Sequence, residues 1–161
     1  MPVAFVASLA ATVAALLVLR RLVPGLPLRR AAAPLSVAEA IVAAMGVIGL
    51  AWHCGAMFYR PLVGGLPGTG VMIDQINAMG VASLIWYAVP AVLLLVGLRR
   101  QHAVAVVAMA VALLAVGVTM YDDGPLPAHL AAIFASVVVL AAVVSLLIVP
   151  PWRRRPVVSG K

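Results

Sequence analysis

Long apolar runs alternate with short polar segments along the whole of this chain. Five runs approach or reach the roughly 20 apolar residues that an α-helix needs to cross a hydrocarbon core of ~30 Å. They cover about 3–19, 36–59, 71–98, 103–121 and 128–149. Between them lie helix-breaking residues such as Pro24, Gly25, Pro61 and Gly64. The pattern predicts an all-α, polytopic membrane helix bundle with five transmembrane helices.

Composition points to lipid as the surrounding solvent. Hydrophobic residues make up 66% of the 161 positions and charged residues 9%, and the mean hydropathy is +1.21. So few polar residues cannot cover an apolar core in water, whereas a bilayer accepts an apolar exterior. We therefore expect one membrane domain over 1–161 with a basic tail at 150–161. It would belong to a multi-pass protein of the cell membrane, specifically a bacterial plasma membrane, with membrane lipids as direct partners.

The basic residues predict how the bundle is oriented. Short loops that carry arginine and lysine stay on the cytoplasmic side of a membrane. Five spans place ten of the 11 basic residues on one side and leave Arg60 on the other. The ten are Arg20, Arg21, Arg29, Arg30, Arg99, Arg100, Arg153, Arg154, Arg155 and Lys161. The pattern thus predicts an N-terminus outside and a C-terminus in the cytoplasm, with Asp122 and Asp123 outside.

Several classes of function find no support in the sequence. It contains no Ser/His/Asp arrangement, paired carboxylates, HExxH or phosphate-binding loop. The single cysteine, Cys54, excludes an internal disulfide. The arginines form separate short clusters and not the contiguous basic surface that nucleic-acid binding needs. We predict that the protein is not an enzyme and does not bind nucleic acid.

Coordinating side chains within the runs are the candidate functional residues, because such groups are costly in a bilayer. Spacings of three and four residues let Met57 share a helix side with Cys54 and with His53. The topology places seven soft ligands in the outer half of the bundle: His53, Cys54, Met57, Met72, Met79, Met120 and His129.

Thioether, thiolate and imidazole groups together select Cu(I), so these seven residues predict a copper site. The alternative is structural, since methionine commonly fills gaps in apolar cores and a histidine at a membrane rim often only makes a hydrogen bond. Three further polar residues lie within the runs. Glu39 is near the inner start of the second run, and Asp74 and Gln75 enter the third, where a helix dipole or interhelical hydrogen bonds would also accommodate them.

The stretch 53–86 carries a family resemblance. A histidine near the outer end of one helix, His53, is followed by a Pro/Gly turn and then by Asp74, Gln75, Gly80 and Trp86. This order resembles part of the CtaG-type cytochrome c oxidase assembly proteins, over roughly a fifth of the chain and with a longer Gly-to-Trp spacing. The resemblance implies an accessory or assembly protein of a respiratory oxidase that binds copper transiently on the outer side.

Two other functions stay open. A non-catalytic structural subunit would pack its apolar faces against a larger membrane protein complex, with the methionines as core. Small residues, such as Gly46 with Gly49 and Ala51 with Gly55, would let its helices approach closely. A small channel or carrier would need a polar lining at the midplane, which the Ala, Val and Leu of the fourth and fifth runs do not offer.

Overall fold

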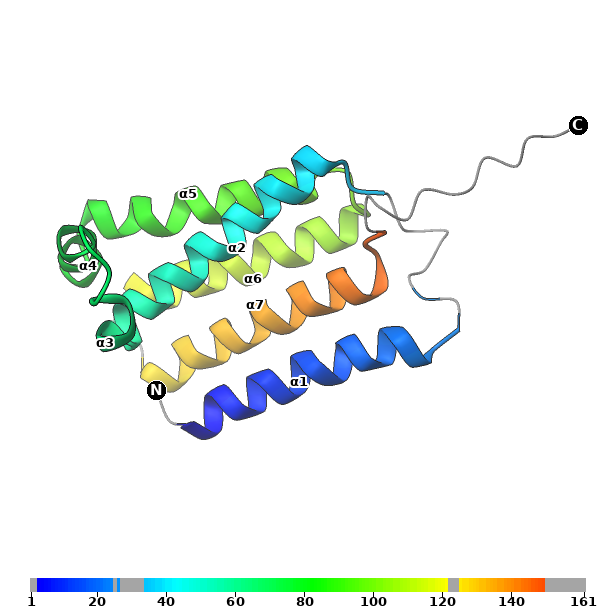
Figure 1. The fold of residues 1–161 in the computed structure, drawn as a ribbon, viewed down its shortest axis with the longest axis horizontal. Coiled ribbons are helices and arrows are strands. Elements are labelled where there is room, and N and C mark those ends of the chain that lie inside the picture. Colours follow the sequence, from blue (N-terminus) through cyan, green and yellow to red (C-terminus); the bar gives the residue numbers. More distant parts are fainter. Residues whose placement is uncertain (1–2, 25, 27–33, 122–124, 150–161) are drawn as a thin grey trace, which may run out of the picture.

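A computed structural model describes residues 3–24, 26, 34–121 and 125–149 of the protein. Within these ranges the chain forms seven helices (Figure 1). They are α1 (Val3–Leu22), α2 (Val37–Phe58), α3 (Arg60–Val63), α4 (Gly70–Asn77), α5 (Val81–Leu98), α6 (Ala103–Tyr121) and α7 (Leu126–Leu146). Five of them, α1, α2, α5, α6 and α7, are long and apolar enough to cross a membrane. The prediction of an all-α bundle with five spans is confirmed.

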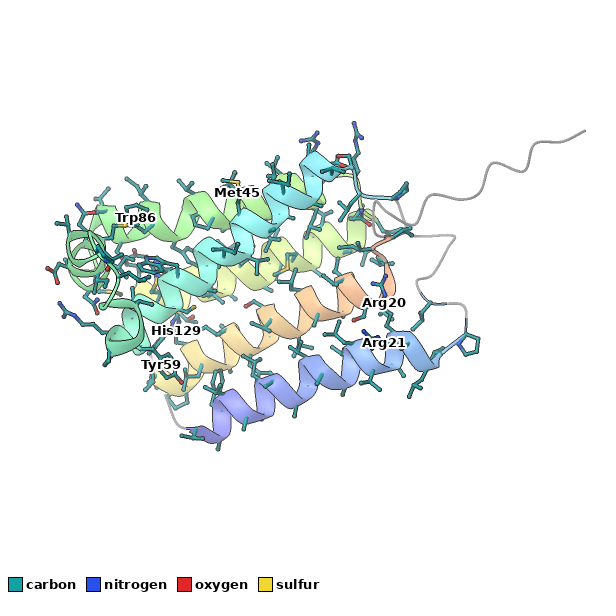
Figure 2. All side chains as sticks on the ribbon, in the orientation of Figure 1. Arg20, Arg21, Met45, Tyr59, Trp86 and His129 are labelled. Atoms are coloured by element: carbon teal, nitrogen blue, oxygen red, sulfur yellow. The ribbon has the colours of Figure 1, made fainter. Side chains whose placement is uncertain are left out.

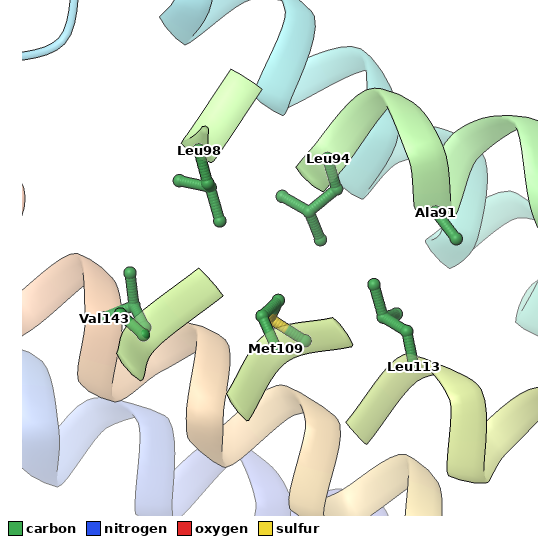
Figure 3. Close-up of a cluster of buried hydrophobic side chains, with 7 residues drawn as sticks. Ala91, Leu94, Leu98, Met109, Leu113 and Val143 are labelled. Carbon is green, nitrogen blue, oxygen red and sulfur yellow. The ribbon is translucent and has the colours of Figure 1, made fainter. Parts of the chain in front are cut away.

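The five long helices run side by side, and the short helices α3 and α4 lie together at one end of the bundle (Figure 1). We call this the α3–α4 end. Helix α2 packs most extensively on α5, α6 packs on α7, and α1 packs on α7. A buried cluster from α5, α6 and α7, which includes Leu94, Leu98, Met109 and Val143, fills the other half of the bundle (Figure 3).

The third apolar run forms two helices, so the expectation of one continuous helix over 71–98 is wrong. Met79 adopts a left-handed backbone conformation with φ of 52°, and Gly80 then begins α5 with extended backbone. Two side-chain hydrogen bonds hold α4 in place across this break. Asn77 Nδ2 donates to the Ala56 carbonyl at 3.1 Å, and Trp86 Nε1 donates to Gln75 Oε1 at 3.1 Å. Only α5 is therefore the spanning part of this run in the described residues.

Glycines let α2 and α5 touch through their backbones. A Cβ added to Gly46 would lie 2.7 Å from the Pro90 carbonyl oxygen, and one on Gly49 would lie 2.6 Å from Pro90 Cγ. On the facing helix, a Cβ on Gly97 would lie 2.6 Å from the backbone nitrogen of Ala43. These contacts bear out the prediction that Gly46 and Gly49 permit close approach, as small residues do between membrane helices.

Polar contacts gather at the end opposite α3 and α4, which we call the arginine end. There Ser36 and Glu39 form a capping box that satisfies free backbone groups at the start of α2. The buried Glu39 carboxylate also lies 3.2 Å from Arg100 Nε and 3.8 Å from Arg99 Nη2. Pairing of this kind is what makes a buried carboxylate tolerable. The predicted in-span carboxylate thus has a structural role at the bundle end.

Arg20 joins the first helix to the last. Its guanidinium donates to the carbonyl oxygens of Val144 and of Ile148, the latter at 2.9 Å. The carbonyls at a helix C-terminus lack partners within the helix and carry the negative end of its dipole. Arg20 therefore supplies both hydrogen bonds and charge where α7 ends, and it lies beside that end together with Arg21 (Figure 2).

The structure groups the described arginines as the sequence predicts, with Arg20, Arg99 and Arg100 at one end and Arg60 at the other. Which end faces the cytoplasm stays a prediction. The remaining charged residues of the topology argument lie outside the described residues: Arg29, Arg30, Asp122, Asp123, Arg153, Arg154, Arg155 and Lys161, as does the tail 150–161.

Candidate functional site

The last turns of α2 place His53 in the interior of the α3–α4 end. Its side chain is 2% exposed, and its Nε2 lies 3.2 Å from Sδ of Met120 on α6. The imidazole also packs edge-on against the ring of Tyr87 on α5, with centroids 5.6 Å apart. The Tyr87 hydroxyl donates to the Leu113 carbonyl, which fixes the ring. Three helices thus converge on one imidazole.

The second ring nitrogen of His53 is an unusual feature of this site. Nδ1 is buried and makes no hydrogen bond to any described residue. Leaving a buried polar group unpaired costs about 1–3 kcal/mol, so each such atom needs an explanation. Trp52 Nε1, Ser83 Oγ and Ser145 Oγ are also unpaired, but His53 is distinguished by its contact with the soft sulfur of Met120.

His129 lies nearby, but its contacts are different. Its buried ring has Nδ1 3.0 Å from Thr119 Oγ1 and lies 6.0 Å, centroid to centroid, from the ring of Phe58. Thr119 directly precedes Met120, so the two histidines approach α6 at adjacent positions. Met57 packs against the buried cluster that contains Met120. Four of the seven predicted ligands, His53, Met57, Met120 and His129, therefore gather in one region of the bundle.

The other three predicted ligands lie elsewhere. Cys54 lines an apolar cavity, because one residue along a helix turns a side chain by about 100° away from its neighbour. Met72 is half-buried on α4, and Met79 is 37% exposed in the turn before α5. The side-chain contacts that the described residues make with His53 come from Met120 and Tyr87, on other elements than these three. The predicted set thus divides into a central group and three outlying residues.

The polar residues that carry the family resemblance form contacts at the outer surface of the α3–α4 end. Arg60 Nη2 and Asp74 Oδ1 are 2.6 Å apart, and both side chains are largely exposed. Exposed pairs of this kind contribute little to stability, ~0–1 kcal/mol. Gln75 accepts the hydrogen bond from Trp86 already described. Asp74 lies in the second turn of α4, so the expected dipole contact at a helix start is not what holds it.

Sequence reasoning missed two contributors, Tyr87 and Thr119. Tyr87 lies in the middle of an apolar run, and a hydroxyl buried there requires a partner; that isolated tyrosine was the available signal. The sequence held no comparable signal for Thr119, since threonine hydroxyls in membrane helices ordinarily donate to a carbonyl of the preceding turn. Thr119 does so as well, to the Ala115 carbonyl at 2.8 Å.

The donor set fits a soft metal better than a hard one. Among the described residues no three His, Cys, Asp or Glu side chains come together to hold a metal ion. An imidazole and a thioether in contact, with a further methionine packed nearby, are the kind of ligands that Cu(I) takes.

Fold and site together define a multi-pass helical membrane protein with a buried histidine–methionine pair. No family model matches the chain, and neither the curated proteins nor the solved structures include a significant match to it.

Proposed function

We propose that this protein binds Cu(I) transiently at His53 and Met120 and serves as a membrane-embedded accessory or assembly protein of a respiratory oxidase. The observation that carries the proposal is the 3.2 Å contact between His53 Nε2 and Met120 Sδ, next to an unpaired, buried Nδ1. The oxidase link depends on the resemblance at Asp74, Gln75, Gly80 and Trp86.

The pair supplies what transient binding requires. An apolar surrounding excludes water and competing hard ligands, and two or three soft ligands hold a monovalent ion without the closed shell of a structural site. Met57 is the nearest candidate for a third ligand, because it packs against the Met120 cluster. His129 supports the site from outside, through Thr119.

Competition for Cu(I) tests the binding step. The purified protein in mild detergent, kept reducing, is titrated against a chromophoric Cu(I) chelator. We expect one bound Cu(I) per chain. We expect His53→Leu and Met120→Leu each to weaken binding by at least about tenfold, because even loss of a residue that only orients a metal ligand lowers affinity on this scale. Met57→Leu should weaken it less.

Met109→Leu is the matched control. Met109 lies on the same helix as Met120 and is also buried, but it packs in the apolar cluster of Figure 3. Its substitution should leave Cu(I) binding unchanged. No Cu(I) retention by the native chain, or equal loss in Met109→Leu and Met120→Leu, would refute the site. Normal copper content in the oxidase of cells that lack the protein would refute the accessory role separately.

A further inference from the structure

An apolar cavity of about 420 Å³ lies between the five long helices. Phe5 and Leu9 of α1 form one wall, and α2 forms another from Val47 to its end, followed by Tyr59. The size is typical of pockets that bind small molecules, which run to ~300–1,000 Å³. Unlike the lipid-facing surface of a single helix, this space is enclosed on several sides by different helices.

Two of the hydroxyl groups along the cavity already donate hydrogen bonds within the protein. The Ser136 hydroxyl donates to the Ile133 carbonyl at 2.8 Å, and the Tyr87 hydroxyl donates to the Leu113 carbonyl. None of the described residues that line the space is charged. A bound molecule would gain apolar contact along most of its length and hydrogen bonds along almost none of it, which selects a hydrocarbon chain.

The length and position of the cavity indicate which part of the bilayer would supply the hydrocarbon chain. Val47 and Tyr59, the residue directly after α2, are twelve positions apart, which is about 18 Å along a helix axis. One leaflet occupies half of a ~30 Å hydrocarbon core. Tyr59 lies at the α3–α4 end (Figure 2), and tyrosine is favoured where hydrocarbon meets lipid headgroups. The cavity therefore spans about one leaflet and reaches the headgroup level at Tyr59.

We infer that this cavity binds one acyl chain of a membrane lipid, taken from the leaflet at the α3–α4 end, with the lipid's glycerol region beside Tyr59. The chain fills a space that would otherwise cost stability as an empty cavity. The inference does not rest on copper binding, because His53 and Met120 are not among the lining residues.

Photo-crosslinking tests the inference on the full chain. The protein is reconstituted in vesicles of phosphatidylethanolamine and phosphatidylglycerol that contain a phospholipid with a diazirine in the middle of one acyl chain. After illumination, peptides are mapped by mass spectrometry. We expect adducts on cavity-lining residues such as Leu50 and Leu113, in addition to adducts on lipid-facing residues such as Val92 and Val107.

Substitutions that fill the cavity provide the decisive comparison. Ala51→Phe and Val137→Phe add bulk from two different walls, and each should lower the cavity adducts by at least about fivefold while sparing the lipid-facing ones. Ala44→Phe is the control, because Ala44 is exposed on the same face of α2, two turns away and outside the cavity. If one filled variant does not fold, the other supplies the result.

Three outcomes would overturn the inference: adducts confined to lipid-facing residues, cavity adducts unchanged in both filled variants, and an equal loss in Ala44→Phe. A competition arm separates acyl chains from isoprenoid tails. If a long-chain quinone at equal mole fraction removes the cavity adducts and an unlabelled phospholipid does not, the occupant is an isoprenoid and the acyl-chain assignment is wrong.

Discussion

Replacing Gly46 with alanine tests whether α2 and α5 touch through their backbones. The added Cβ would lie 2.5 Å from the backbone nitrogen of Leu94, 2.7 Å from the Pro90 carbonyl oxygen and 2.8 Å from Leu94 Cα. All three are backbone atoms, so no side-chain rotation relieves the clash. Because ordinary contact begins near ~3.5 Å, the two helices must separate by about 1 Å.

The separation of the two helices lowers the free energy of unfolding. Overpacking a tight interface costs ~1–3 kcal/mol, and a 1 Å gap also forfeits a quarter to a half of each neighbouring dispersion contact. Alanine returns up to ~1 kcal/mol as a better helix former than glycine. The net expectation is a loss of about 2 kcal/mol in the free energy of unfolding, measured by titrating the protein in mixed micelles with a denaturing detergent.

Alanine substitutions at two other glycines should cause smaller losses of stability than Gly46→Ala. A Cβ on Gly117 would lie 3.1 Å from Cε1 of Tyr87, a milder contact than those of Gly46 and one with a side chain, whereas a Cβ on Gly65 would meet nothing within 4 Å. Gly117→Ala should therefore fall between Gly46→Ala and Gly65→Ala, the last within ~0.5 kcal/mol of the native chain. A Gly46→Ala protein as stable as the native one would refute the backbone contact.

Two further predictions concern the helix ends and the topology. Arg20→Leu removes charged hydrogen bonds worth ~1.5–3 kcal/mol each from the end of α7; in the same micelle titration it should destabilise the protein clearly, while Arg21→Leu, an exposed neighbour, should not. A green fluorescent protein fused after residue 161 should fluoresce, and alkaline phosphatase inserted at Gly65 should be active. The reverse result for both reporters would invert the predicted orientation.

The helices that cross the membrane were predictable because lipid allows few alternatives. Every backbone group in a bilayer must be satisfied within its helix, so run length alone indicates a span. The break at Met79 was not predictable in the same way. Residues 71–80 mix apolar side chains with Asp74, Gln75 and Asn77, a composition that also suits a helix entering a membrane, and Gly80 marked no boundary by itself. The hydrogen bond from Trp86 to Gln75 that stabilises the break depends on tertiary placement.

The sequence predicted how deep in the bundle the residues of the candidate site lie, but not toward which helix their side chains point. Topology alone brought His53, Met57, Met120 and His129 to one end of the bundle. Which of His53 and Cys54 faces α6 depends on how α2 is rotated about its axis, and that rotation follows from the glycine contacts with α5. A sequence pattern in which almost every position is apolar carries little information about rotation. The His53–Met120 contact therefore required coordinates.

The pairing of α1 with α7 has a consequence for how the chain is made. Helix α1 packs mainly on α7, through Arg20 and through the Phe5–Phe134 ring contact, although Arg20 and Ile148 lie 128 positions apart in the sequence. During synthesis α1 therefore has to remain in the lipid without this partner until α7 has been made, as distant contacts must form late. A chain that stops before α7 thus leaves α1 without this partner and Arg20 without the carbonyl oxygens of Val144 and Ile148.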